Sequence, residues 1–283
     1  MSGPEKAYKN LPFLNSSAAR HIRILCEYEE PRDRFRHAGV RDTIVFFGSA
    51  RARDPETAAA ELHHAERELS HAHTDEERRR LEHLVKQATR KVKLSRYYDE
   101  ARLLAHKLTT WSMQRASHHQ YLISTGGGPG IMEAGNRGAH EAGGRSVGLA
   151  ISLPFEEKIN RYVTPELGFE FHYFFMRKYW FTYLAKAMVV FPGGFGTMDE
   201  LFESFTLRQT RKVRKRMPTV LFGNDFWDEI MDLQAMVDWG VISEQDLLLF
   251  HRSNTVDDAF DFLVDAIEET ERQEASRPTV EGA

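Results

Sequence analysis

Residues 187–200 of this 283-residue chain read AMVVFPGGFGTMDE, and this stretch decides the fold. The apolar run from Ala187 to Phe191 is typical of a strand buried in a sheet. A proline and three glycines then turn the chain, and Leu201 and Phe205 continue as the apolar positions of a helix. Strand, glycine-rich turn and helix in this order predict one unit of a parallel sheet.

The same pattern recurs on either side of this stretch. A second glycine-rich turn, Gly126 to Gly130, follows the apolar run 121–124 and precedes a helix that carries Ile131. Further strands are predicted at residues 43–47, 147–151, 169–171 and 219–222, and further helices at about 226–239 and 257–271. We therefore expect an α/β fold, a parallel sheet with helices on both faces. Ligands bind such sheets outside the carboxyl ends of the strands, where both glycine turns fall.

Around this core the composition changes. Residues 1–41 predict an N-terminal arm, residues 42–272 the main domain, and residues 273–283 a mobile tail. An insertion at about 56–95 contains no Gly or Pro and carries a narrow apolar seam. The seam predicts two helices, separated by a capping box at Thr74 and Glu77, packed as a hairpin or against a partner chain. The second helix is expected to run on to about Trp111.

Composition excludes several classes of protein. Lys and Arg number 38 against 42 Asp and Glu, and this balance does not suit a generic nucleic-acid binder. The single cysteine, Cys26, excludes an internal disulfide and a Cys-cluster zinc site. No apolar run approaches the roughly 18 residues of a membrane span, and the N-terminus lacks a signal-like segment. We expect a cytoplasmic protein with no nucleic-acid or membrane partner and no bound metal.

The first glycine turn allows two interpretations. The backbone N–H groups of Gly127, Gly128 and Gly130, at the start of a helix, suit a phosphate group. The same residues also suit a tight turn that binds nothing. The turn is not a Walker loop, because no Gly-Lys-Ser/Thr follows, and Gly48-Ser49-Ala50 lacks the spacing of a dinucleotide fingerprint.

The second turn is more specific. Gly193, Gly194, Gly196 and the Thr197 hydroxyl repeat the phosphate-binding pattern. Thr197 and Glu200 also fit a capping box, which is the structural alternative for Glu200. A carboxylate in contact with a phosphate group would be repelled by it. Glu200, one helical turn beyond the phosphate position, would instead lie near the sugar, where a carboxylate stabilises positive charge or positions water.

Residues 171–181 are strongly aromatic, and their role is open between a sandwich for a base and core or subunit interface. Arg177 and Lys178 interrupt this run, and an arginine beside an anion site binds oxyanions bidentately. A basic run at 208–216 is compatible with polyanion binding or with a solvated helix end, which the net charge favours.

These motifs resemble the Lonely Guy (LOG) family, the cytokinin riboside 5'-monophosphate phosphoribohydrolases and related bacterial nucleotide N-glycosidases. Residues 192–200 resemble the family's PGGxGTxxE signature, and Gly126 to Met132 its other glycine motif. Residues 174–178, FFMRK, fall where the family often carries MHxRK. The resemblance covers roughly residues 42–270 without the insertion. The insertion is typical of the longer bacterial members.

The resemblance implies a Rossmann-like fold, nucleoside 5'-monophosphate substrates, and a homodimer or higher homo-oligomer with the site near the subunit interface. It assigns catalysis to Arg177 and Glu200. We expect the base and ribose to lie near Ser49, Glu133, Met176 and Lys178. Proteins of this family have often been labelled lysine decarboxylases, but the sequence offers no motif for pyridoxal phosphate, and we expect no cofactor.

The sequence thus predicts hydrolysis of AMP or an N6-substituted AMP to free base and ribose 5-phosphate. Phe175 stands where the family motif has His, so the motif does not define how this chain would bind the base. The alternative is a non-catalytic carrier of a nucleotide or other phosphate ligand on the same fold. The presence of both Arg177 and Glu200 favours the enzyme, since a carrier needs neither.

Overall fold

The fold is organised around β1 (Asp42–Phe47), a strand buried on both faces. We describe it from a computed structural model, which covers residues 4–116, 120–152 and 159–276. Successive side chains of β1 point to opposite faces: Ile44 and Phe46 enter one hydrophobic cluster, and Val45 and Phe47 the other. An apolar run without alternation is what a strand buried on both faces requires.

The strands form one parallel sheet in the order β4-β3-β2-β1-β5-β6-β7. The other strands are β2 (Tyr121–Thr125), β3 (Ser146–Ile151), β4 (Gly168–Phe171), β5 (Ala185–Val190), β6 (Thr219–Phe222) and β7 (His251–Ser253). Because β1 lies between β2 and β5, the two glycine turns and the end of β1 meet at one edge of the sheet. The fold is the expected α/β, Rossmann-like parallel sheet.

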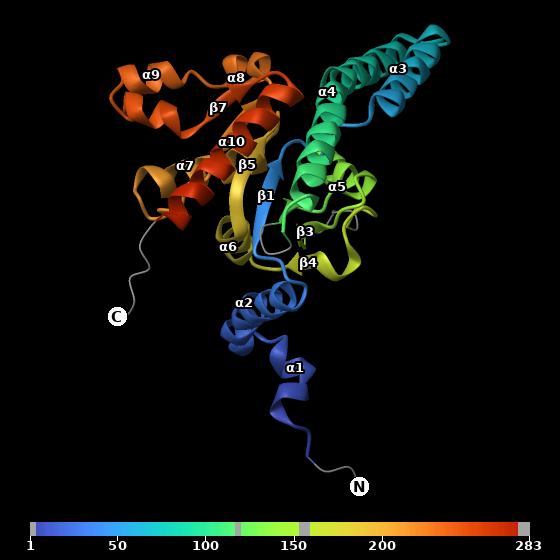
Figure 1. The fold of residues 1–283 in the computed structure, drawn as a ribbon. Helices are drawn as coiled ribbons and strands as arrows, with labels where there is room; N and C mark the ends of the chain where they lie inside the picture. The colour runs from blue at the N-terminus through green and yellow to red at the C-terminus, as the bar shows by residue number, and fades with distance from the viewer. Residues whose placement is uncertain (1–3, 117–119, 153–158, 277–283) are drawn as a thin grey trace.

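Helices cover both faces (Figure 1). One hydrophobic cluster includes residues of α2 (Arg20–His37), α6 (Phe174–Leu184), α7 (Phe195–Gln209) and α8 (Asn224–Ile230). The other includes residues of α4 (Asp75–Met113), α5 (Ile131–Glu141) and α10 (Val256–Ala275). The short helices α1 (Leu11–Leu14) and α9 (Leu233–Asp238) lie further out (Figure 1). No helix in the described ranges has the length and apolar character to cross a membrane.

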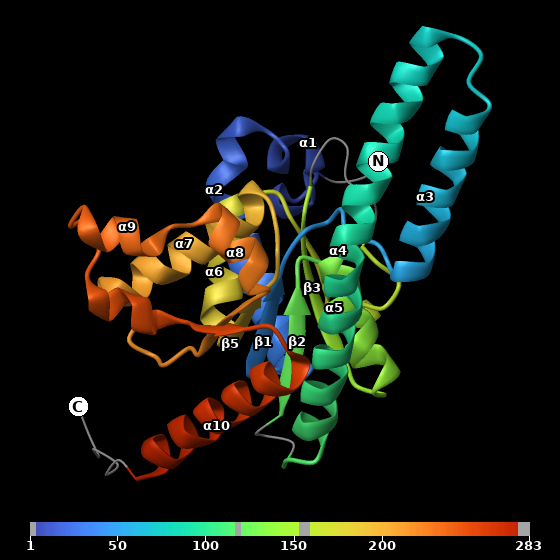
Figure 2. The same ribbon diagram turned by 90° about the horizontal axis from the view of Figure 1, so that it is seen from above.

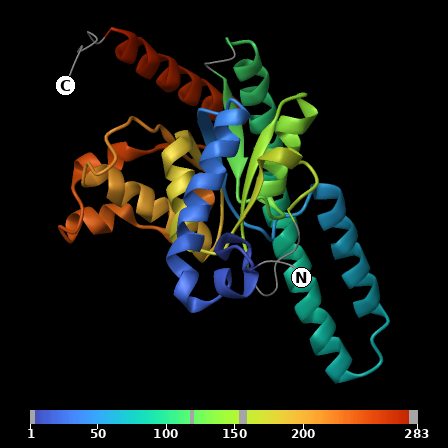
Figure 3. The same cartoon turned by 90° about the horizontal axis from the view of Figure 1, so that it is seen from below.

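The insertion is a helical hairpin of α3 (Pro55–Ser70) and α4, whose outer half extends beyond the sheet (Figures 1 and 2). Leu81 and Ala88 of its seam are buried, and α3 covers that part of α4. Thr74 caps α4 through the N–H of Glu77, but the Glu77 carboxylate accepts from His73 rather than from Thr74. The inner half of α4 packs against α5 and α10 (Figure 3). Part of the seam is therefore covered within one chain, while Val92 is 36% exposed.

Several predicted boundaries differ from the structure. The helix expected at 226–239 is divided, because Met231 is extended and Asp232 caps α9 through the N–H of Ala235. Strand β7 was not predicted, since His-Arg-Ser has no apolar pattern. Helix α10 continues to Ala275, into the segment expected as a tail, and residues 277–283 lie outside the described part, as do residues 1–3 of the arm.

Two cations of the basic run serve the fold. Arg208 donates to the Thr219 hydroxyl at 3.0 Å, and Lys215 donates to the Tyr183 carbonyl at 2.7 Å. Burial lowers the pKa of Arg208, and burial, opposed by Asp42, lowers that of Lys215 to about 8. The solvated-helix interpretation is therefore incomplete, because these two side chains are partly buried.

The contact between α4 and α5 predicts the effect of one substitution. A Cβ added at Gly138 would lie 2.0 Å from the Arg102 carbonyl oxygen and 2.9 Å from Ala105 Cβ. Gly138→Ala should lower the free energy of unfolding by about 1–3 kcal/mol, the usual cost of overpacking, in urea denaturation. Gly196→Ala is the control, since a Cβ there meets nothing within 4 Å. Equal urea midpoints for the two variants would contradict the prediction.

Candidate functional site

The backbone of Ser49, just after β1, joins the two glycine turns. Its N–H donates to the Pro192 carbonyl at 2.9 Å, and its carbonyl accepts from the N–H of Ile131 at 3.1 Å. Its hydroxyl accepts from the N–H of Arg51 at 3.1 Å. Ser49 therefore lies between the N-termini of α5 and α7, and its hydroxyl takes part in a local turn.

A buried polar network holds the first glycine turn. The N–H of Gly127 donates to the Thr125 hydroxyl at 2.9 Å, and Asn160 donates to the carbonyls of Gly127 and Gly128, each at 3.0 Å. Gly127 therefore serves the turn and offers no free donor. The N–H groups of Gly128 and Gly130 have no acceptor in the part of the chain described. Asn160 was missed because it lies in a polar segment with no motif.

Packing also explains Gly130. It has a φ of +71°, and a Cβ there would lie 2.3 Å from the Ser49 carbonyl oxygen, so no other residue fits. The tight-turn interpretation thus explains why Gly127 and Gly130 are glycines, while the N–H groups of Gly128 and Gly130 have no acceptor among the described residues.

The second glycine turn is more open. Helix α7 follows Gly194 without a side-chain cap, so the interpretation of Thr197 and Glu200 as a capping box is wrong. The N–H groups from Gly194 to Thr197 find no acceptor among the described residues. A Cβ at Gly194 or Gly196 would meet nothing within 4 Å, although one at Gly193 would collide with the Thr197 side chain. Free N–H groups facing open space at a helix N-terminus suit an anion.

Arg177 reaches this edge from α6. Its Nε donates to the Leu149 carbonyl at 2.9 Å, and its Nη2 would lie 2.9 Å from a Cβ added at Gly126. The thioether of Met132 approaches the same point, at 2.6 Å, and Met132 was not among the nominated residues. Met176 instead is buried in the hydrophobic cluster under α6. Met132, rather than Met176, is the methionine against the first glycine turn.

The three carboxylates at the start of α7 have different environments. Lys178 Nζ lies 2.8 Å from Asp199 Oδ2 and 2.6 Å from Glu203 Oε2. The Glu200 carboxylate has no hydrogen bond or ion pair within the described residues. Burial raises the pKa of Glu200 to about 7, although Arg177 and Lys178 oppose the change. Glu200 is thus a carboxylate that titrates near neutral pH.

Two other residues predicted for the base and ribose pocket, Glu133 and Lys178, bind neighbouring side chains instead. Glu133 accepts a hydrogen bond from the Tyr98 hydroxyl of α4 at 2.9 Å, which turns it toward the hairpin. The Lys178 ammonium faces the α7 carboxylates rather than open space. The structure therefore gathers Ser49, Arg177 and Glu200 with the two glycine turns at one edge, with Glu133 directed away.

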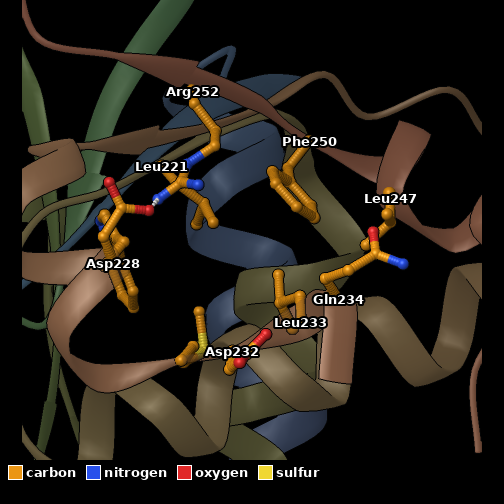
Figure 4. Close-up of a pocket in the computed structure, with 10 residues that line it drawn as sticks. Leu221, Asp228, Asp232, Leu233, Gln234, Leu247, Phe250 and Arg252 are labelled. Carbon is orange, nitrogen blue, oxygen red and sulfur yellow. Dashed lines mark hydrogen bonds and ion pairs between the residues drawn. The ribbon is translucent and has the colours of Figure 1, made fainter. Parts of the chain in front are cut away.

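Two cavities lie on the α7 side of the sheet. A groove of about 530 Å³ along α7 is lined by Lys178, Asp199, Glu203 and aromatic residues that include Phe195 and Phe202. A cavity of about 460 Å³ lies over β6 and β7, where Arg252 pairs with Asp228 beside Leu221 and Phe250 (Figure 4). The nominated site residues do not line the second cavity. The groove, which includes Lys178, adjoins the candidate site.

Comparison with known proteins supports the resemblance over part of the chain. A family model described as "possible lysine decarboxylase", the label that Lonely Guy proteins have often carried, matches residues 132–263. The match includes Arg177, Glu200 and the second glycine turn, so this stretch is similar to that family. No curated protein matches the chain.

Two solved structures are similar. TM1055, an X-ray structure from structural genomics, is 27% identical with a TM-score of 0.44, over 62% of this chain and 89% of TM1055. The Moco carrier protein from Chlamydomonas reinhardtii is 18% identical with a TM-score of 0.37, over 61% of this chain and 88% of the carrier. With TM-scores below 0.5, neither likeness bears on function.

A decarboxylase would require pyridoxal phosphate held by a lysine as a Schiff base, which forms from a neutral amine. Burial alone would lower the pKa of Lys178, but its bonds to Asp199 and Glu203 outweigh burial and raise it. Lys178 is the lysine that lines the groove in the described residues. Its paired ammonium does not fit the requirement.

The environment of Glu200 predicts a pH-dependent stability. Because its folded pKa is raised to about 7, its ionisation opposes folding, and wild-type stability should fall between about pH 4.5 and pH 7. Glu200→Gln removes this cost. At pH 8 its free energy of unfolding, measured by urea denaturation, should exceed that of wild type by about 1–3 kcal/mol. At pH 4 the two proteins should unfold alike. An advantage that is the same at both pH values would contradict the assignment.

Proposed function

We propose that the protein hydrolyses the N-glycosidic bond of a purine nucleoside 5'-monophosphate, AMP or an N6-substituted AMP such as a cytokinin riboside monophosphate. The observation that carries the proposal is Glu200, a half-buried carboxylate without a hydrogen-bond or ion-pair partner in the described residues. It lies one turn beyond the free N–H groups of the second glycine turn. The similarity of residues 132–263 to the family that carries this signature supports the same chemistry.

In this proposal the phosphate is a handle. The N–H groups from Gly194 to Thr197, the Thr197 hydroxyl, and the N–H groups of Gly128 and Gly130 hold the phosphate oxygens. The reacting bond is the C–N bond at C1' of the ribose, which needs no metal. Bound this way, the ribose faces α7 and the base extends toward Met132 and Arg177.

Glu200 and Arg177 divide the chemistry. As the C1'–N bond breaks, positive charge develops on the ribose, and the Glu200 carboxylate stabilises it and accepts a proton from the attacking water. The hydroxyl adds to C1', the base leaves with the bonding electron pair and takes a proton from solvent, and Glu200 then releases its own proton to solvent. Arg177, held by the Leu149 carbonyl, orients the substrate. A Glu200 pKa near 7 suits a base that works at neutral pH.

The direct test is incubation with AMP, GMP, CMP, isopentenyl-AMP and adenosine, with chromatographic detection of free base. We expect adenine and ribose 5-phosphate from AMP, and turnover of adenosine lower by at least about 100-fold, because adenosine lacks the group that the turns bind. Comparable turnover of both would contradict the phosphate handle. Tight AMP binding without free base would instead identify the non-catalytic carrier.

A second prediction isolates the carboxylate. Glu200→Gln should reduce kcat for AMP by about 100-fold or more, because it removes the charge while keeping the shape. The matched control is Glu141→Gln, which alters a carboxylate bound by Arg102 and Arg137 outside the site. Full activity of Glu200→Gln would contradict the catalytic role, and a rate loss in both variants would indicate a general structural effect.

We also propose a homodimer or larger homo-oligomer formed through α6 and α7. Large apolar side chains are exposed on both helices, and these are Phe174, Phe175, Tyr183, Phe195 and Phe202. Phe195 is 96% exposed within the second glycine turn. Clustered exposed aromatic residues mark interaction surfaces.

The single Cys26 and a nucleotide substrate are consistent with a cytoplasmic setting.

The interface predicts a change of mass. In sedimentation velocity, the Phe175→Asp protein should contain a larger monomer fraction than wild type, because the substitution places a charge in the apolar contact. Tyr8→Asp is the control, since Tyr8 is 67% exposed on the N-terminal arm, away from α6. A Phe175→Asp protein with wild-type mass would exclude this surface.

A further inference from the structure

The groove along α7 contains a charge arrangement that the proposed mechanism does not use. Asp199 and Glu203 lie four residues apart on α7, so their carboxylates share one face of the helix and repel each other. Lys178, from α6, bridges them at 2.8 Å and 2.6 Å. The Lys178 side chain is 16% exposed, whereas those of Asp199 and Glu203 are 57% and 36% exposed, so the ammonium is largely covered and the carboxylates face water.

Glu200, one residue after Asp199 on α7, interacts electrostatically both with these groups and with Arg177. In the described residues, the charges that act on its carboxylate are Arg177 and Lys178 from α6, which favour its ionised form, and Glu203 and Asp199 from α7, which oppose it. Burial is the larger influence and raises its pKa to about 7. Lys178 therefore acts on Glu200 directly, and also by neutralising the two carboxylates that flank it.

We propose that Lys178 is a positioning residue: by holding Asp199 and Glu203 together on one face of α7, it leaves Glu200 as the one α7 carboxylate that meets the substrate and Arg177. The consequence for catalysis rests on the function proposed above. Without the ammonium, two repelling carboxylates become free to compete for Arg177. The same loss makes ionisation of Glu200 harder, and the active form then needs a higher pH.

The test measures Glu200 itself before activity. In protein labelled with ¹³C-glutamate, the Glu200 carboxyl signal is assigned by its loss in Glu200→Gln and titrated by NMR without substrate. In Lys178→Met we expect its pKa to rise by about one unit. In AMP hydrolysis, kcat should fall by about fivefold at pH 7 and return close to the wild-type value at pH 9, with little change in KM. Lys178→Arg should retain the wild-type titration.

Two further variants distinguish positioning from other roles. Adding Asp199→Asn and Glu203→Gln to Lys178→Met should bring the Glu200 titration back toward wild type, because the repelling charges are gone. The matched control is Lys186→Met, since Lys186 is 14% exposed and paired with Glu274 at the opposite end of β5. It should leave the titration unchanged.

The outcomes separate this inference from the proposed function. An unchanged Glu200 titration in Lys178→Met overturns the inference, whatever the protein hydrolyses. The inference is also overturned if Lys178→Met raises KM at every pH and the triple variant does not restore the Glu200 titration. Lys178 would then be a direct substrate contact. Absence of AMP hydrolysis with the expected titration overturns the proposed function and leaves the electrostatic role of Lys178 supported.

Discussion

The junction at Ser49 is the constraint on which the candidate site depends. One N–H and one carbonyl of the same residue fix the β5 turn and the start of α5 to the end of β1. Because the junction is made of backbone alone, it sets the distance between the two helix N-termini without help from side-chain rotamers. The same closeness excludes a Cβ at Gly130. The glycine motif is thus as much a packing requirement as a ligand motif.

Polar groups at this edge divide into satisfied and unsatisfied ones. The fully buried Asn136 accepts from Thr125 and Asn160 and donates to the Val147 carbonyl, so the network under the first turn has its partners. Glu200, which follows the second turn on α7, has no hydrogen-bond or ion-pair partner among the residues described. Burial of an unpaired carboxylate is costly, and such costs concentrate where a protein carries out chemistry. This contrast supports the choice of Glu200 over its better-paired neighbours.

Much of this arrangement was accessible from the sequence, for identifiable reasons. The parallel sheet and the place of its two glycine turns follow from apolar runs that end in glycines, and Arg177 and Glu200 stand out within motifs. What the sequence could not supply depends on contacts distant along the chain. Asn160 reaches the first glycine turn from some thirty residues away. The sequence predicted Met176 for the base pocket, and only packing shows that Met176 is buried and that Met132 lies against the first glycine turn. The pairing of Lys178 with two α7 carboxylates likewise depends on how α6 and α7 cross.

The position of β1 also has a consequence for how the chain acquires its structure. On one side β1 pairs with β2, but on the other Thr43 and its successors pair with residues from Ala185 onward, after the hairpin and two further strands have been made. During synthesis this apolar strand therefore keeps one edge unpaired while more than a hundred residues follow it. Contacts so distant in sequence slow folding, and an open apolar edge invites association with other chains. The ligand edge, which needs both partners of β1, therefore cannot form until β5 has been made.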